Sequence, residues 1–171
     1  MARIFLGLGS NLGDRFQNLQ DAVYGLGTFL SLIRASRVYE TAPWGPVQDQ
    51  PLFLNACLEA TTDLPVNELL PAIKALEQDL GRGHSEKWGP HKIDIDLLFY
   101  ENEVKQVGER YVPHRQIRQR AFVLRPLADI APYYVHPVHR QSVAELLAEV
   151  STEGIALYPR LLELPDAAPL A

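Results

Sequence analysis

The feature that most restricts the fold of this chain is the run of residues 93–100. It is rich in β-branched and aromatic residues and follows the turn dipeptide Gly89-Pro90, which is typical of a β-strand. Side chains alternate between the two faces of a strand, so one face is expected to carry Ile93, Ile95, Leu97 and Phe99. Asp94 and Asp96 then share the opposite face, roughly 6–7 Å apart along the strand.

This pair of aspartates suggests a metal site. Neighbouring carboxylates repel each other and lose solvation when their face is covered, and a divalent cation removes both costs. Mg²⁺ takes oxygen ligands and completes its shell with water and substrate phosphates, so the pair predicts Mg²⁺-dependent phosphoryl transfer. Alternatively, Asp94 and Asp96 belong to the polar outer face of an amphipathic strand, although strand interiors are depleted in Asp.

Size and charge narrow the function classes. A chain of 171 residues suits one domain, expected over residues 1–163, with a loose tail at 164–171. The net charge of −5 provides no global basic field, so we expect neither a nucleic acid nor a membrane as partner. The apolar run 22–33 is too short to span a bilayer. The single cysteine, Cys57, excludes an internal disulfide and fits a cytoplasmic protein.

Hydrophobic periodicity and turn residues predict the remaining elements. We expect strands at residues 4–8, 33–40, 53–62, 104–107 and 155–158. We expect helices from Asp14 to about residue 26, at 66–80 with a kink at Pro71, from 121 up to Pro126, and from the capping box at Ser142 to about residue 150. Residues 7–14 are interpreted as a glycine-rich turn between strand and helix, and residues 101–103 as a hairpin turn.

Two further segments carry candidate binding groups. Phe53 and Asn55 share one face of a predicted strand, and a flat ring beside a carboxamide suits a planar heterocycle. An ordinary half-exposed Phe beside an Asn is the alternative. The segment 82–92 places cations just before the aspartates, as a polyphosphate requires, although a solvated charged loop would look the same.

Taken together, these residues resemble a known family. Trp88-Gly89-Pro90 followed by residues 94–98 resembles the motif of the 6-hydroxymethyl-7,8-dihydropterin pyrophosphokinases. Further matching segments follow in family order at residues 8–13, 39–45, 48–51, 53–56, 81–82, 112–114 and 120–122. The resemblance covers roughly residues 3–150. It implies an α+β, ferredoxin-like sandwich, with a mostly antiparallel sheet and helices on its faces.

The resemblance also implies the reaction and its residues. The diphosphoryl group of ATP would pass to the hydroxymethyl oxygen of 6-hydroxymethyl-7,8-dihydropterin, with release of AMP, in folate biosynthesis. By motif position, Asp94 and Asp96 would hold two Mg²⁺ ions and act in catalysis with Arg82 and His91. Residues expected at ATP are Glu77, Arg82, Lys87, Trp88, Leu97, His114 and Arg120. Residues expected at the pterin are Thr41, Ala42, Trp44, Phe53, Asn55 and Phe122. The protein is expected to be a monomer.

The chain departs from the family pattern at His91, where the family usually has Arg after Trp-Gly-Pro. Arg offers a permanent charge and a bidentate fork, and His offers neither at neutral pH. We therefore expect turnover to be slower, or to fall as His91 deprotonates, unless Lys87 or Lys92 takes over the role.

Two other function classes stay open. A different two-metal nucleotidyl or phosphodiester enzyme could use the same aspartate pair, and it would yield AMP esters or nucleic-acid products instead of free AMP. A non-catalytic ferredoxin-like ligand-binding module would leave the pair as idle surface.

Overall fold

The computed structural model describes residues 1–43, 45–46, 49–81 and 92–165 of the chain. Its strands are β1 (Ala2–Ser10), β2 (Ser31–Ala35), β3 (Tyr39–Thr41), β4 (Phe53–Thr62), β5 (Asp94–Tyr100), β6 (Lys105–Val107), β7 (Arg110–Val112) and β8 (Ala156–Leu157). Its helices are α1 (Arg15–Leu26), α2 (Val66–Asp79), α3 (Ala121–Ile130) and α4 (Val143–Ala148), with a 3₁₀ turn, η2 (Ile117–Gln119), before α3. No helix within these ranges is long and apolar enough to cross a membrane.

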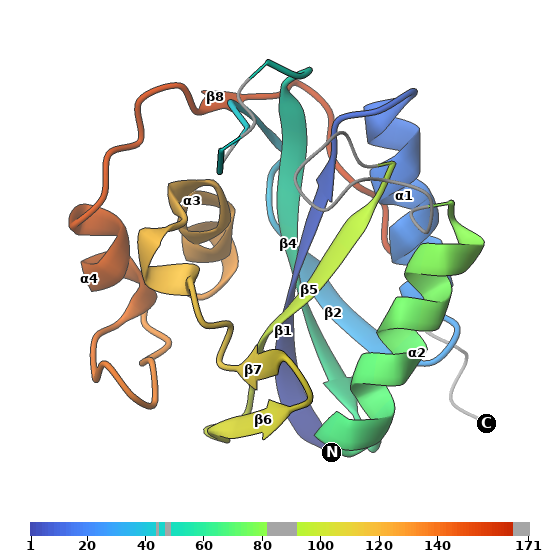
Figure 1. Cartoon of the computed structure of the whole chain (residues 1–171), viewed down its shortest axis with the longest axis vertical. Coiled ribbons are helices and arrows are strands. Elements are labelled where there is room, and N and C mark those ends of the chain that lie inside the picture. Colours follow the sequence, from blue (N-terminus) through green and yellow to red (C-terminus); the bar gives the residue numbers. More distant parts are fainter. Residues whose placement is uncertain (44, 47–48, 82–91, 166–171) are drawn as a thin grey trace.

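One antiparallel sheet organises the molecule (Figure 1). Its strand order is β5-β1-β4-β3-β8, and β2 also pairs with β4. Helices α1 and α2 cover one face of the sheet and α3 and α4 lie on the other, while β6 and β7 form a separate ribbon beside β5 (Figure 1). The predicted ferredoxin-like α+β sandwich is confirmed.

The alternation of β4 explains why both faces of the sheet are covered. Leu54, Ala56, Leu58 and Ala60 belong to the core under α1 and α2, as predicted. Cys57 points the other way, into the core that α3 and α4 complete, where burial raises the pKa of its thiol. The sheet is therefore buried on two sides.

A β-bulge changes the predicted faces of β5. Leu6 pairs with Leu97 and Phe5 with Phe99, so Leu98 is an extra residue opposite β1. The prediction that Phe99 shares the face of Leu97 is therefore wrong: Phe99 joins the α3 core, and Tyr100 joins the α1 and α2 core. The bulge follows the two aspartates, and they keep the common face expected of them.

Four further predictions on local structure are corrected. The strand expected at 33–40 is two strands, separated where Ser36 and Cys57 exchange hydrogen bonds with each other. Gly7 and Gly9 lie inside β1 and not in a turn. Strand β6 pairs with β7, so residues 101–103 do not form a hairpin with β5. Helix α3 continues past Pro126 to Ile130, because the added turn buries apolar side chains, and this outweighs the lost backbone hydrogen bond. Helix α2 includes Pro71, as expected.

The predicted caps and the chain end agree with the structure. The Asp14 side chain accepts a hydrogen bond from the Gln17 backbone, and Ser142 and Glu145 form a capping box. After β8, the Gln20 side chain exchanges two hydrogen bonds with the backbone of Glu163, which ties this segment to α1. Part of the tail expected to be loose, residues 166–171, lies outside the described residues.

His136 gives the fold a predictable response to acid. The residue is 4% exposed, and burial lowers the pKa of its side chain to about 4, with His139 and Arg118 acting in the same direction. The unfolded chain therefore binds more protons below about pH 6.5, so this contribution is complete above that pH and is lost as the pH falls toward 4. We expect His136 alone to lower the free energy of unfolding by on the order of 1 kcal/mol between pH 7 and pH 5.

Urea unfolding at both pH values checks this expectation. His136→Asn is the matched variant, because an Asn oxygen can accept the two backbone hydrogen bonds that Nδ1 now accepts from Val138 and His139. The variant should show a smaller loss of stability between pH 7 and pH 5. The same loss in both proteins would contradict the assignment.

Candidate active site

Two rows of paired residues cross the sheet near one end of β1, β4 and β5. In the first row Asp94 pairs with Gly9, which pairs with Asn55 on its other side. In the next row Asp96 pairs with Gly7. Paired residues point to the same face, so both aspartates and Asn55 lie on the face that carries α3. With neighbouring strands about 4.8 Å apart, Asp94 and Asn55 have backbones separated by roughly 10 Å.

Glycines keep the space between the two aspartates and Asn55 open. A Cβ atom on Gly9 would lie 2.9 Å from Asn55 Oδ1 and 3.6 Å from Phe53 Cδ1. A Cβ atom on Gly7 would lie 3.4 Å from Leu98. The two glycines therefore form a floor without side chains between the aspartates and Asn55. Sequence reasoning missed this role, although glycine at alternate positions of a strand signals close approach on one face.

The Asn55 side of the floor brings together several residues expected at the pterin. Asn55 Nδ2 donates a hydrogen bond of 2.6 Å to Thr41 Oγ1, and both residues are buried. Phe53, which is half-buried, pairs with Thr41 across β3 and β4. Ala42 follows Thr41 and is exposed. A fixed amide beside a ring is an arrangement that can recognise the edge and the face of a planar ligand.

Arg120 joins the aspartate side of the floor to α3. Its Nη1 lies 3.5 Å from Asp96 Oδ2, and its Nη2 donates a hydrogen bond of 2.9 Å to Gln116 Oε1. The guanidinium also lies 5.6 Å from the ring centroid of Phe122, which packs against the α3 core. A permanent cation thus lies between the acid pair and an aromatic ring. Sequence reasoning did not identify Gln116, whose contact with Arg120 depends on the fold.

His114 lies on the same side and is neutral at pH 7. Burial lowers the pKa of His114 to about 4; Arg120 and Arg110 act in the same direction, and Asp94 opposes them. Its Nδ1 accepts a hydrogen bond from the Gln116 backbone, so the proton of the neutral ring is assigned to Nε2, which lies 4.0 Å from Asp96 Oδ2. His114 can therefore donate a hydrogen bond into the site without adding a charge.

Glu77 fixes the strand that carries the aspartates. It is buried on α2, and its Oε2 accepts a hydrogen bond of 2.8 Å from the backbone N–H of Ile95, between Asp94 and Asp96. Its Oε1 lies 4.0 Å from Arg110 Nη2. Because β5 is an edge strand, this bond satisfies a backbone donor that no neighbouring strand takes up. The structure thus gives Glu77 a positioning contact, and its contact with ATP stays a prediction.

The remaining predicted residues fall into two groups. The Leu97 side chain is buried in the α1 and α2 core, on the face opposite Asp96, so any contact with ATP would involve its backbone. Five predicted residues lie outside the described part of the chain: Trp44, Arg82, Lys87, Trp88 and His91.

The donor set fits Mg²⁺ better than a structural metal ion. The described residues include no group of three or more His, Cys, Asp or Glu side chains that could hold a metal. Asp94 and Asp96 offer two carboxylates on one face, both half-buried. Mg²⁺ commonly takes one or two protein carboxylates and completes its shell with water and phosphate oxygens, whereas a structural zinc site needs four protein ligands.

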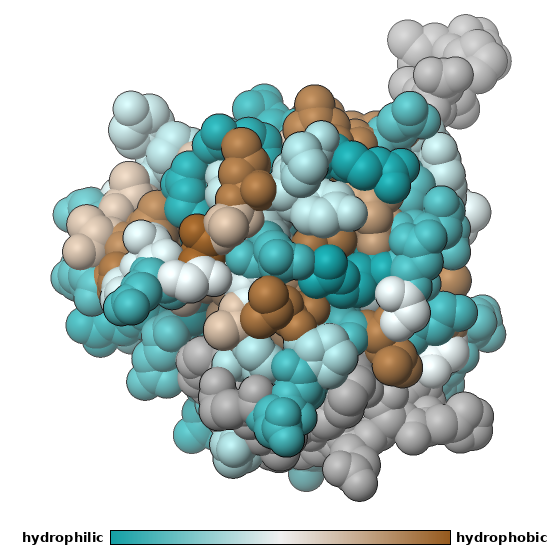
Figure 2. All heavy atoms as spheres, turned by 90° about the horizontal axis from the view of Figure 1, so that it is seen from above, coloured by the Kyte–Doolittle hydropathy of each residue, from teal (hydrophilic) through white to brown (hydrophobic). Residues whose placement is uncertain are grey.

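Figure 2 views the molecule from the end at which β4 and β5 begin. On the described surface in this view, hydrophobic areas are small and are separated by hydrophilic ones (Figure 2). This surface suits polar and charged ligands better than an apolar partner.

Comparison with known proteins gives the family. A model of the family described as 7,8-dihydro-6-hydroxymethylpterin-pyrophosphokinase (HPPK) matches residues 5–132. The chain belongs to this family. It is 42% identical over 149 residues to the 2-amino-4-hydroxy-6-hydroxymethyldihydropteridine pyrophosphokinase of Aquifex aeolicus, covering 87% of this chain and 92% of the relative. Identity to the protein of the same name from Methylorubrum extorquens is also 42%, covering 91% of this chain and 98% of the relative.

Solved structures support the fold. A Plasmodium falciparum HPPK-DHPS triple mutant superposes with a TM-score of 0.68 at 17% identity, covering 86% of this chain. A second P. falciparum HPPK-DHPS structure, of the A437G mutant, gives a TM-score of 0.70 at 16% identity. The chain spans 43% and 45% of the length of these two solved chains. The likeness therefore concerns the HPPK fold, and the match to the family model carries the assignment.

Proposed function

We propose that this chain transfers the diphosphoryl group of ATP to the hydroxymethyl oxygen of 6-hydroxymethyl-7,8-dihydropterin, with release of AMP, in folate biosynthesis. Family membership supports the reaction. The observation that carries the proposal is that Asp94 lies across Gly9 from Asn55, which is hydrogen-bonded to Thr41, while Asp96 follows in the next row on the same face. A polyphosphate fits the acidic side through metal ions, and a planar heterocycle fits the amide side.

On the phosphate side, Asp94 and Asp96 hold two Mg²⁺ ions, which supply charge neutralisation at the phosphate oxygens. Arg120 and His114 lie beside Asp96 and donate hydrogen bonds to the phosphate oxygens of ATP. Because both side chains are held in place, they stabilise the negative charge that spreads over the transferred group. By family motif, Arg82, Lys87, Trp88 and His91 act on ATP from the segment outside the described residues.

On the pterin side, Phe53 and Phe122 stack on the ring, and Asn55 with the backbone near Thr41, Ala42 and Trp44 recognises its edge. This binding directs the alcohol toward the phosphate side, which removes much of the entropic cost of the encounter. Among the described residues of the site, His114 is neutral and its Nδ1 already accepts a hydrogen bond, so it is a poor general base. A loose transition state makes a strong base dispensable.

Product analysis tests the reaction. The protein is incubated with ATP, Mg²⁺ and 6-hydroxymethyl-7,8-dihydropterin, and nucleotides are separated by chromatography. AMP formation that requires both the pterin and Mg²⁺ is expected. ADP, an AMP ester of the pterin, or no turnover would contradict the proposal and favour, respectively, another kinase, a nucleotidyl transferase or a binding module.

Gly9→Ala is expected to raise KM for the pterin by about tenfold, with a smaller effect on KM for ATP. The new Cβ would meet Asn55 Oδ1 at 2.9 Å, and Asn55 is held from its other side by Thr41. Steady-state kinetics with each substrate varied in turn measures both constants. Gly7→Ala is the comparison within the floor: the nearest atoms to its Cβ would belong to the Leu98 side chain, at ordinary contact distance, so its effect on KM for the pterin should be smaller than that of Gly9→Ala. Equal changes in KM for both substrates would contradict the assignment of the amide side.

Other features rest on the sequence alone. We propose a single domain over residues 1–163, a monomer, and a cytoplasmic location consistent with the single cysteine. We also keep the proposal that His91 stands in for the family's Arg. A kcat that is flat between pH 6 and pH 8, together with wild-type behaviour of His91→Ala, would exclude that role.

A further inference from the structure

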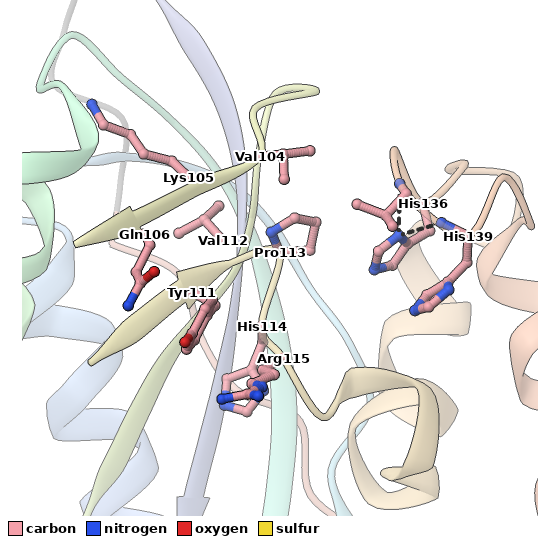
Figure 3. Close-up of a pocket in the computed structure, with 11 residues that line it drawn as sticks. Val104, Lys105, Gln106, Tyr111, Val112, Pro113, His114, Arg115, His136 and His139 are labelled. Carbon is pink, nitrogen blue, oxygen red and sulfur yellow. Dashed lines mark hydrogen bonds between the residues drawn. The ribbon is translucent and has the colours of Figure 1, made fainter. Parts of the chain in front are cut away.

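A cavity of about 370 Å³ lies between the β6–β7 ribbon and the loop that contains His136 and His139 (Figure 3). This volume is within the range of small-molecule sites. Its apolar lining includes Val104, Val112, Pro113 and Val138. None of the described residues that line it is acidic, although acidic residues outnumber Lys and Arg in the chain, 21 to 16. The cavity therefore favours a ligand with an apolar body and negative charge.

His136 supplies a hydrogen-bond donor to this cavity. Its side chain is buried, and Nδ1 accepts hydrogen bonds of 3.1 Å from the backbone N–H groups of Val138 and His139. These bonds assign the proton of the neutral ring to Nε2. Within the described part of the chain, no residue accepts a hydrogen bond from this Nε2, and the second ring nitrogen faces the opposite wall, toward Pro113 (Figure 3). A donor at the wall of a cavity, without a protein acceptor among the described residues, is available to an acceptor on a ligand there.

Arg115 supplies positive charge at the other wall. Its guanidinium lies 4.7 Å from the ring centroid of Tyr111. Because Tyr111 also lines the cavity, this contact keeps the cation near the cavity. The Lys105 ammonium points away from His136 and His139 (Figure 3), so we assign it no role. One neutral donor and one stacked guanidinium match a single carboxylate better than a polyphosphate.

We propose that this cavity binds a small organic carboxylate with an apolar body, and that its occupant alters the binding of ATP. The coupling rests on His114, which lines the cavity, donates its backbone N–H to Leu98 on β5, and approaches Asp96 within 4.0 Å. An occupant in contact with His114 thus acts on the residue that connects the cavity to the acid pair. The effect on ATP binding rests on the proposed function, whereas the binding of a carboxylate in the cavity does not.

Calorimetric titration of the full chain tests the binding, with naphthalene-2-carboxylate as probe and naphthalene-2-carboxamide as its uncharged match. We expect the carboxylate to bind at least about tenfold more tightly than the amide. His136→Asn keeps the acceptor for the two backbone N–H groups but moves the donor away from the position of Nε2, because the shorter Asn side chain places its NH2 group near the position of the ring Cδ2. Arg115→Met removes the charge. Each should weaken binding about tenfold. Lys74→Met, an exposed position on α2, should leave it unchanged.

Equal binding of the two probes, wild-type affinity in both cavity variants, or no binding at all would overturn the site. The coupling is tested by repeating the titration with Mg²⁺ and a non-hydrolysable ATP analogue. We expect the Kd of the probe to change by about threefold or more. The change should reach a plateau once the ATP analogue saturates its own site. No change would overturn the coupling. An apparent Kd that rises with the analogue without limit would show that the probe occupies the ATP site, which overturns the proposal.

Discussion

Asp94→Asn and Asp96→Asn are each expected to lower kcat by about 100- to 1,000-fold without unfolding the protein. An Asn side chain has the size of Asp but only a neutral oxygen to offer a metal ion. Both positions are half-buried, and their pairing with Gly9 and Gly7 uses the backbone, so the substitution leaves β5 in place. KM for the pterin should change little, because Asn55 and Thr41 lie on the other side of the floor.

Steady-state kinetics, with the thermal midpoint measured in parallel, checks this prediction. Asp79→Asn is the matched control, since it removes an exposed carboxylate from the end of α2. It should retain wild-type activity. Activity within a few-fold of wild type in both site variants would show that the acid pair is idle surface. A large fall in the thermal midpoint would show that it serves the fold.

Arg120→Met is expected to lower kcat by about 100-fold, and Arg120→Lys by about tenfold. The planar guanidinium contacts Asp96 with one nitrogen and Gln116 with another, and a Lys ammonium cannot keep both contacts in that geometry. Because Arg120 also lies near the Phe122 ring, KM for the pterin should rise as well, by a smaller factor.

The control for Arg120 lies two residues earlier. Arg118 is exposed, and its Nη2 lies 4.0 Å from Glu149 Oε2, so Arg118→Met should leave kcat unchanged. Kinetics of the three variants under saturating Mg²⁺ and ATP separates the effects. Full activity of Arg120→Lys would mean that only the charge matters. An equal loss in Arg118→Met would point to a general electrostatic effect in place of a specific contact.

Local pattern predicted much of the fold because the alternation in β4 and the caps of α1 and α4 are encoded by neighbouring residues. The β5 bulge was not predictable in this way. Leu98, Phe99 and Tyr100 are all apolar, and either face of the sheet accepts them, so only pairing with β1 decides their direction. The faces of Asp94 and Asp96 could be predicted because they precede the bulge.

The site also has features that the sequence predicts and features that depend on the fold. The spacing of Asp94 and Asp96, and of Phe53 and Asn55, is visible in the sequence. The glycine floor between them depends on pairing β1 with strands far along the chain, and the Glu77 contact with Ile95 depends on α2 lying against an edge strand. Neither has a local signature. The roles of residues in segment 82–91 rest on the family motif and stay predictions.

The most direct test of the acid pair is a count of bound metal ions. Mn²⁺ binding in the presence of a non-hydrolysable ATP analogue, followed by electron paramagnetic resonance, gives the number of ions per chain in wild type and in the Asp94→Asn, Asp96→Asn double variant. Two ions in wild type, and loss of the protein-dependent binding in the double variant, are predicted. The same number of ions with the same affinity in both proteins would contradict the account.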